Sequence, residues 1–303
     1  MIPVYNCAHT LRQTLESVLA QDIGQSEMEI EVIDDFSTRD NPEAIVFQVG
    51  KDRVKYFRQD ANVGVARTFN TCLKRSRGHL VHILHGDDTV LPGFYKEIRE
   101  AEKAQPGLSF FYLRSIITDA DLKPISESLC IPSLKLASTD PTFAYYENPF
   151  RTPGVVIRRH LYEQIGGFDE ELAHVADWDL WVRAIAAGGG WAGSQPLCLY
   201  RESSVAHTSH QMRSGANIRD ALRLAEKWAL KALPNFSLTR FRREIAKSAF
   251  AQVLHYRKSQ DKEAAALNLA VWMQIVPRAY RIKFALRWVS QKLWASVPRP
   301  TSN

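Results

Sequence analysis

Acidic residues stand in pairs where this chain could carry out metal-assisted chemistry. Two apolar runs each end on adjacent aspartates and a third acidic cluster comes later, at Asp34-Asp35, Asp87-Asp88 and Asp177-Trp178-Asp179. Side chains at the carboxyl ends of parallel strands lie where open α/β sheets bind their ligands. One or two carboxylates together with substrate phosphates are the usual ligands of Mg²⁺. The pairs therefore indicate a metal-assisted reaction on a phosphorylated substrate.

Alternating strands and helices must position these carboxylates. Short apolar runs predict strands around residue 4 and at residues 29–33, 54–57 and 80–84. Amphipathic spacing and capping residues between them predict helices at residues 10–20, 41–50, 62–76 and 92–103. Such alternation is typical of α/β domains, so we predict an α/β fold with a Rossmann-like, mostly parallel sheet flanked by helices.

The pattern changes after residue 108. Strand-like segments at 108–115 and 155–158 flank an irregular stretch, and a helix at 177–187 carries the third acidic cluster. Residues 217–294 predict three or four further helices. We therefore expect a catalytic domain over residues 1–210. A helical C-terminal region would follow over residues 211–303.

The charge distribution and the hydropathy of the chain limit the kinds of partner that we expect. The 303-residue chain carries a net charge of +6, and its last 29 residues alone contain six basic residues and no acidic one. Because a nucleic-acid-binding domain more often spreads its basic face over the fold, we expect no nucleic-acid partner. The chain shows no secretory signal and no apolar stretch of roughly 20 residues that could span a bilayer. We expect a cytoplasmic protein, with peripheral attachment to the cytoplasmic face of the membrane left open.

Six segments match one known family in order and spacing. They are Ile2-Pro3-Val4-Tyr5-Asn6, residues 31–38 (EVIDDFST), residues 62–67 (NVGVAR), Gly86-Asp87-Asp88, residues 166–170 (GGFDE) and residues 177–181 (DWDLW). Together they resemble family 2 glycosyltransferases of the GT-A fold, over roughly residues 1–205. The resemblance implies a nucleotide-sugar donor, a divalent cation (Mn²⁺ or Mg²⁺) and inversion at the anomeric carbon. It also implies nucleotide-sugar binding in about residues 1–110 and the acceptor side in about 110–210.

The same resemblance implies roles in the donor site. Asp88 would bind the metal, and Asp87 would face the ribose or the water shell of the metal. Asp35 would bind the base, because a carboxylate accepts hydrogen bonds and so suits a ring N–H of uracil or thymine. Four further residues would contact the nucleotide: Pro3, Tyr5, Asn62 and Arg67.

Each of these roles has a plainer structural alternative. Gly-Asp-Asp-Thr is good turn chemistry, so the second aspartate pair also suits a solvated turn. Asp35 also suits a segment that begins the next helix, with Ser37 as its N-cap. Tyr5 equally suits a packed aromatic residue, and Arg67 a solvated helix face. On the sequence alone these alternatives stay open.

Asp177 is the candidate catalytic base. Glycosyl transfer needs a carboxylate on the acceptor side to take the hydroxyl proton. The family usually has Glu-Asp here, whereas this chain has Ala176-Asp177, which removes one acidic partner and keeps the base. Trp178 would either stack on an acceptor sugar or belong to the core, and Asp179 is expected to be structural.

The two ends of the chain raise separate points. Family members carry several apolar residues before the first matching segment, which leaves open whether Met1 is the natural start. Residues 281–294 predict a basic amphipathic helix with two tryptophans, which is suited to an anionic membrane surface. The alternative is a terminal helix that packs its apolar stripe on the preceding helices.

We therefore predict an inverting glycosyltransferase that moves one sugar from a nucleotide-diphosphate donor, with UDP or dTDP favoured. Its acceptor would be a hydroxyl of a glycan or of a lipid-linked glycan, as in polysaccharide biosynthesis. Two alternatives remain at this stage. One is a sugar nucleotidyltransferase, although no glycine-rich basic loop stands near residues 3–10. The other is a sugar-binding or assembly subunit without turnover.

Overall fold

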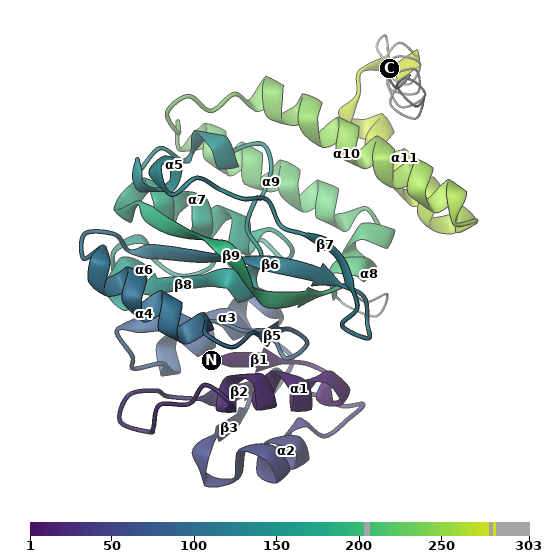
Figure 1. Cartoon of the computed structure of the whole chain (residues 1–303). Helices are drawn as coiled ribbons and strands as arrows, with labels where there is room; N and C mark the ends of the chain where they lie inside the picture. Colours follow the sequence, from purple (N-terminus) through teal and green to yellow (C-terminus); the bar gives the residue numbers. More distant parts are fainter. Residues whose placement is uncertain (203–206, 279–280, 283–303) are drawn as a thin grey trace, which may run out of the picture. The chain divides into compact units, whose positions relative to one another are not determined.

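Strands and helices alternate through the first 104 residues, as the sequence predicts (Figure 1). The computed structural model describes residues 1–202, 207–278 and 281–282. The elements of this first part are β1 (Ile2–Val4), α1 (Ala8–Leu19), β2 (Glu31–Asp34), α2 (Pro42–Ile45), a π-helical turn (Val46–Gly50), a 3₁₀ turn (Lys51–Arg53), β3 (Lys55–Arg58), α3 (Val65–Arg75), β4 (Leu80–His82), β5 (Thr89–Val90) and α4 (Phe94–Ala104).

The next hundred residues hold longer strands and short helices. They are β6 (Phe110–Thr118), β7 (Pro124–Glu127), α5 (Ser133–Ala137), 3₁₀ turns at Pro141–Ala144 and Thr152–Gly154, β8 (Val155–Arg158), α6 (Arg159–Ile165), α7 (Ala176–Gly188) and β9 (Gly190–Arg201). The predicted strands at 108–115 and 155–158 and the predicted helix at 177–187 are thus confirmed within two or three residues.

Two sheets meet beside the first strand. β1, β2 and β3 pair in parallel, and a six-stranded sheet has the order β4-β8-β6-β9-β5 with β7 on β6 (Figure 1). The backbone N–H groups of Leu84 and Gly86 donate to the carbonyls of Met1 and Pro3, at 3.0 and 3.2 Å. The segment that follows β4 therefore runs along β1, and it leads directly into the Asp87-Asp88 pair.

The α/β architecture is confirmed, but the sheet is mixed where we predicted mostly parallel pairing. Parallel pairing holds for β1 to β3 and for β6 with β9. β4 and β6 pair antiparallel with β8, and β5 pairs antiparallel with β9. Helical crossovers impose parallel pairing on the early strands. β8 instead enters the sheet from a long irregular connection, which lets it run against both of its neighbours.

Burial follows the predicted helix faces and strand positions. Leu11, Leu15 and Val18 of α1 are buried at helical spacing and belong to one hydrophobic core with the first strands. β1 and β2 are buried along their whole length, as inner strands of a parallel sheet are. The acidic pair at the carboxyl end of β2 is therefore held by a well-packed frame.

The chain divides into two compact units, Met1–Ser203 and Ser204–Asn303. The described part of the second unit contains α8 (His207–Arg213), α9 (Ala216–Leu230), α10 (Leu238–Lys258) and α11 (Lys262–Ile275). Phe250 of α10 packs on Trp272 of α11, with ring centroids 5.0 Å apart. The predicted helical C-terminal region is confirmed up to residue 275.

The predicted amphipathic helix at residues 281–294 lies outside the described residues, apart from Arg281 and Ile282. Across the described helices, none is both long and apolar enough to cross a membrane.

Candidate active site

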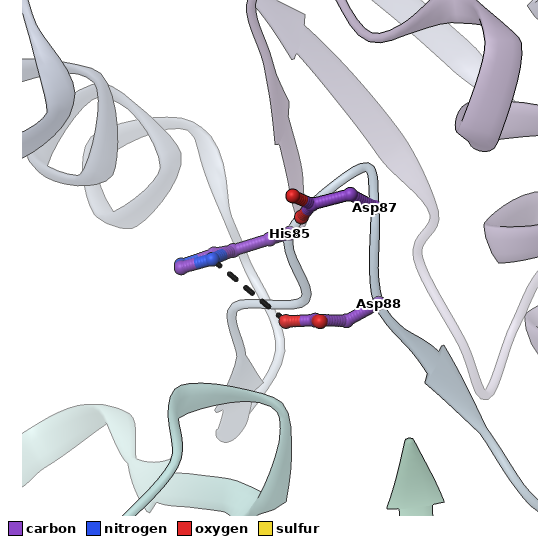
Figure 2. A group of neighbouring side chains, drawn as sticks. All are labelled: His85, Asp87 and Asp88. Carbon is purple, nitrogen blue, oxygen red and sulfur yellow. Dashed lines mark ion pairs between the residues drawn. The ribbon is translucent and has the colours of Figure 1, made fainter. Parts of the chain in front are cut away.

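A tight bend between β4 and β5 carries three potential metal ligands. His85, Asp87 and Asp88 each offer one ligand atom, and these atoms all lie within 4.8 Å of one another. Figure 2 shows the three side chains pointing to the same side of the bend, and His85 Nδ1 lies 3.8 Å from Asp88 Oδ2. The structure thus brings together the predicted Asp87 and Asp88 and adds His85, to which we assigned no role from the sequence.

Gly86 lets this bend lie against β1. A Cβ atom at this position would lie 2.6 Å from Val4 Cγ1 and 2.9 Å from Cys7 Sγ. Because real Cβ contacts are not that short, a larger residue would push the bend away from the strand. Glycine at position 86 therefore suits a bend against which the side chains of Val4 and Cys7 are packed.

The Asp88 carboxylate is set up to receive a cation. Its side chain is 1% exposed, and Oδ1 accepts a hydrogen bond from the Arg201 backbone N–H at 2.9 Å. Oδ2 is buried and has no hydrogen-bond partner among the described residues. Burial, and then the charge of Asp87, raise the pKa of the Asp88 carboxyl well above its usual range, and Arg201 opposes this. A buried oxygen without a donor is costly unless a positive group meets it, so these residues fit a divalent cation.

Arg201 clamps the bend from β9. Its guanidinium, on a residue 6% exposed, donates from Nε to the Asp87 carbonyl at 2.7 Å and from Nη2 to Gln13 Oε1 at 2.6 Å. Nη1 donates to the Ala120 carbonyl. No local sequence pattern predicts this contact, because Arg201 and Asp87 lie 114 residues apart.

Helix α1 holds the same bend from another direction. Thr10 Oγ1 donates to the Gly86 carbonyl at 2.8 Å, and Thr14 Oγ1 donates to the Asp88 carbonyl at 2.7 Å. Both threonines are buried on one face of α1, four residues apart. The backbone of the bend is therefore fixed at both ends by side chains of a packed helix.

The two aspartates at the end of β2 have different environments. Asp34 is fully buried and accepts hydrogen bonds from Ser37 and from the Tyr56 hydroxyl, so it is a structural residue. Asp35 accepts three hydrogen bonds, from the backbone N–H groups of Val63 and Gly64 and from Gln59 Nε2. Burial raises the pKa of Asp35, although the two backbone N–H groups oppose this. Its carboxylate thus ties β2 to the start of α3.

The loop that follows this pair has an unusual backbone. Phe36 has a φ of 64° and Asn6, at the end of β1, has a φ of 52°. Positive φ is uncommon outside glycine, and such residues gather at ligand sites. The suggestion that Ser37 caps the next helix is wrong: Asn41 caps α2 by accepting from the Ala44 N–H, and Ser37 donates to Asp34. The segment at 35–37 is therefore free of a capping role.

The other predicted donor-site residues gather around these two strand ends. Pro3 is buried in β1 and receives Gly86 N–H at its carbonyl, whereas Tyr5 is 46% exposed. Asn62 Nδ2 donates to the Asp35 carbonyl at 3.2 Å. Arg67, near the start of α3, forms an exposed ion pair with Glu170 at 3.0 Å.

Asp177 lies in the first turn of α7. Its Oδ2 accepts a hydrogen bond from Asn148 Nδ2 at 3.3 Å, and Oδ1 accepts from the Trp178 backbone N–H at 2.7 Å. Burial raises the pKa of Asp177 to about 6, while the Trp178 N–H, the nearby Arg151 and Asn148 oppose this. A carboxyl group that titrates near neutral pH suits general-base chemistry. Asn148 had no recognisable signal in the sequence, because it lies in the irregular segment.

Trp178 is a core residue, which corrects its suggested role in stacking on an acceptor sugar. It is 6% exposed, and its indole Nε1 donates to the Ala144 carbonyl at 2.6 Å. A ring buried in this way presents no face to a sugar. Asp179 is structural as expected: it is buried and forms an ion pair with Arg183 at 2.7 Å.

Aromatic rings connect α7 to the bend at residues 85–88. We call this bend the metal bend because it carries the candidate metal ligands. Phe69 stacks on His85 with ring centroids 5.2 Å apart, and Phe168 packs edge-on against Phe69 at 4.9 Å. Phe168 in turn meets Trp181 at 6.1 Å, one helical turn after Asp177. The candidate metal site and the candidate base are therefore attached to one packed cluster.

Solved structures define the class of this fold. The S. aureus TarS fragment 1–349 in complex with UDP-GlcNAc is similar with a TM-score of 0.63 and 19% identity, over 91% of this chain and 80% of that chain. The mannosyltransferase PcManGT from Pyrobaculum calidifontis, in complex with GDP-Man and Mn²⁺, is similar with a TM-score of 0.54 and 19% identity, over 98% and 86%. The fold is that of the GT-A glycosyltransferases.

Sequence comparisons define the family. The model of glycosyl transferase family 2 matches residues 1–166. The succinoglycan biosynthesis protein ExoO of Rhizobium meliloti is 28% identical over 320 residues, which cover 99% of this chain and 85% of that relative. The chain therefore belongs to glycosyl transferase family 2, and the protein is a glycosyltransferase.

Proposed function

We propose that this glycosyltransferase transfers one sugar, with inversion, from a UDP- or dTDP-sugar to a hydroxyl of a growing glycan in a metal-dependent reaction. The observation that carries the proposal is the bend at residues 85–88, where a buried Asp88 oxygen lies beside Asp87 and His85. Asp177, with a pKa raised to about 6, supplies a separate carboxylate for the acceptor.

Asp35 is the proposed contact for the base. Its carboxylate accepts hydrogen bonds from Val63, Gly64 and Gln59, and a side-chain hydrogen bond from Thr68 also lowers its pKa. The ring N–H of uracil or thymine would take the place of one of the two side-chain contacts. Tyr5, 46% exposed at the end of β1, and Asn62 would line the nucleotide, and Pro3 would support it from the strand.

The diphosphate would lie between the bend and the start of α3. Asp88 and Asp87 would hold Mn²⁺ or Mg²⁺, which supplies positive charge to the leaving diphosphate. Arg67 is exposed near the N-terminus of α3, where helix geometry favours anions. Its guanidinium would exchange Glu170 for a phosphate oxygen.

Asp177 would accept the proton of the acceptor hydroxyl at its carboxylate as that oxygen attacks the anomeric carbon. At pH 7 and above a carboxyl group with a pKa near 6 is ionised, and it is still a stronger base than an ordinary aspartate. Asn148 would hold Oδ2 in place through its amide. A single displacement of this kind inverts the anomeric centre.

The acceptor is proposed to be a glycan or a lipid-linked glycan. ExoO is named for succinoglycan biosynthesis, which supports a role in polysaccharide assembly. A lipid-linked acceptor would suit peripheral attachment through residues 281–294 at the cytoplasmic face of the membrane. Sedimentation of the full chain with anionic vesicles at low salt tests that attachment, and failure to sediment would contradict it.

A donor screen tests the proposed reaction. Thermal stability of the full chain is measured with Mn²⁺ and UDP-, dTDP- or GDP-sugars, because a ligand that binds only the native state raises its stability. Nucleoside diphosphate release is then measured with each donor that binds. We expect metal-dependent release from a UDP- or dTDP-sugar. Stabilisation without release from any donor would instead indicate a sugar-binding subunit.

A further inference from the structure

His85 brings a nitrogen ligand to a site whose other two members are carboxylates. We propose that His85 is a direct metal ligand and that it makes this site select later first-row transition ions such as Co²⁺ and Ni²⁺ over Mg²⁺. The inference rests on the proposed metal-dependent function and adds an ion preference to it.

The spacing of the three ligand atoms permits a shared ion. They lie within 4.8 Å of one another, and the His85 Nδ1 to Asp88 Oδ2 distance is 3.8 Å (Figure 2). Metal–ligand bonds of about 2.0–2.2 Å place two ligands of one ion at most about 4.4 Å apart. Side-chain shifts of a few tenths of an ångström therefore bring all three onto one ion.

The His85 ring is held in an orientation that suits ligation. Phe69 is 5% exposed and stacks on the imidazole with an interplanar angle of 27°, so the ring plane is fixed while its nitrogens stay at the ring edge. Phe168 packs edge-on behind Phe69. The His85 side chain is 30% exposed, which leaves a path for an ion to enter from solvent.

Asp88 supplies the independent sign that a cation belongs here. It is 1% exposed, and Oδ2 is turned toward His85 with no hydrogen-bond partner in the described part of the chain. Arg201 already donates to Oδ1, so the second oxygen is the one left for a metal. An acidic turn at the protein surface would have neither a buried carboxylate nor one carboxylate oxygen held by a backbone N–H.

The ligand chemistry then decides the ion. Mg²⁺ prefers an octahedron of oxygen ligands and keeps most of its waters, whereas imidazole nitrogen favours transition ions. For a given site with nitrogen and oxygen ligands, affinity rises from Mn²⁺ through Co²⁺ to Ni²⁺. His85 therefore gains affinity for these ions and contributes little for Mg²⁺.

Electron spin-echo measurements on the Mn²⁺-loaded full-length protein test this directly, because a coordinated imidazole nitrogen modulates the echo. The experiment compares the unsubstituted protein with His85→Asn, and with His85→Gln as a second variant. His79→Asn is the matched control, since His79 is 76% exposed at the other end of β4. Affinities for Co²⁺ and Mg²⁺ are measured on the same four proteins.

We expect a nitrogen signal that both His85 variants lose and the His79 variant keeps. The ratio of Co²⁺ to Mg²⁺ affinity should fall at least about tenfold in the His85 variants, through weaker Co²⁺ binding. A nitrogen signal or an affinity ratio that survives both His85 substitutions overturns the inference and leaves the proposed reaction intact. If the unsubstituted protein binds no Mn²⁺ with or without a nucleotide, both the inference and the metal dependence fail.

Discussion

The metal bend and the start of α7 are two acidic sites that the catalytic unit holds in opposite ways. The bend is pinned by Thr10 and Thr14 from α1 and by Arg201 from β9, through short hydrogen bonds to its carbonyls. Asp177 is held by its neighbouring backbone N–H and by one bond of 3.3 Å from Asn148. The bend is therefore fixed by side chains from two elements, α1 and β9. The Asp177 carboxylate is held by the backbone of its own helix and by one side chain.

This difference matches the roles that we propose for the two sites. Ligands of a metal ion must converge with fixed geometry, so positions set by several elements suit them. A general base depends chiefly on its pKa, which burial and one or two neighbouring groups adjust. The account therefore predicts that changes around the bend alter metal binding, whereas changes around Asp177 alter the pH dependence.

The largest effect on metal binding should come from Asp88→Asn. Loss of an outer-shell partner already costs about 10–100-fold in metal affinity, so loss of a direct ligand should exceed about 100-fold. Thermal stability should not fall, because burial beside Asp87 disfavours the Asp88 charge. Calorimetric titration with Mn²⁺ measures the affinity, with the exposed Asp52→Asn as control. Unchanged affinity in Asp88→Asn would remove Asp88 from the site.

Arg201→Met should have the next largest effect. It leaves the carbonyls of Asp87 and Ala120 and the Gln13 side chain without their donor, each at a cost of about 1–3 kcal/mol. We expect metal affinity to fall about 10–100-fold and the free energy of unfolding to fall by about 3 kcal/mol. Denaturant unfolding and Mn²⁺ titration measure the two quantities.

Arg114→Met is the matched control for that clamp. Arg114 also donates to backbone carbonyls, those of Ser128 and Ser194, and it lies on β6. The Arg114→Met variant should be less stable than the unsubstituted protein and should bind Mn²⁺ with unchanged affinity. If both arginine variants lose stability and neither loses metal affinity, Arg201 does not position the bend.

Substitutions of Asn148 test the Asp177 site through the pH dependence of kcat. Its amide donates to Asp177 and so lowers the pKa of that carboxyl. Asn148→Leu should therefore move the acidic limb of the kcat profile upward from about pH 6, by about half a unit to one unit. Asn148→Asp should move it further, since it adds a like charge. Metal affinity should not change, and a profile unaffected by both substitutions would show that Asn148 does not contact the base.

Arg67 should give the smallest effect. Its pair with Glu170 is exposed on both sides, at 61% and 45%, and such pairs contribute about 0.2–1 kcal/mol. Arg67→Gln should raise the KM for the donor a few-fold with little change in thermal stability. Glu170→Gln should not raise that KM, because it releases Arg67 for phosphate. Equal increases in both variants would indicate that the pair itself shapes the site.

The parts of this molecule that could be predicted from the sequence are those with local causes. Helical spacing of Leu11, Leu15 and Val18 predicted α1, and the apolar run ending in Asp34 marked the end of β2. The sequence motifs also identified Asp88 as a ligand candidate.

The remaining features depend on contacts between distant segments. Arg201 meets Asp87 across 114 residues, and Asn148 meets Asp177 across 29 residues that include β8 and α6. The antiparallel placement of β8 depends on where a long connection returns to the sheet. Trp178 stands next to the candidate base in sequence, but the helical turn directs its ring into the core.

The central claim is that Asp177 acts as the base while a separate bend binds metal and donor. The most direct test compares the rate of sugar transfer by the Asp177→Asn variant with that of the unsubstituted protein at pH 8. We expect kcat to fall about 10²–10⁴-fold with donor KM and Mn²⁺ affinity unchanged.

The same variant carries its own control for folding. Because burial raises the pKa of Asp177 to about 6 from an ordinary value of 3.8, the ionised carboxylate destabilises the folded state above pH 6 and the cost vanishes below pH 3.8. Asp177→Asn should therefore be more stable than the unsubstituted protein at pH 8, with a gain that fades toward pH 4. A variant with this stability and almost no transfer is the predicted result. Transfer at a near-normal rate, or a loss of transfer that follows a loss of Mn²⁺ binding, would contradict the account.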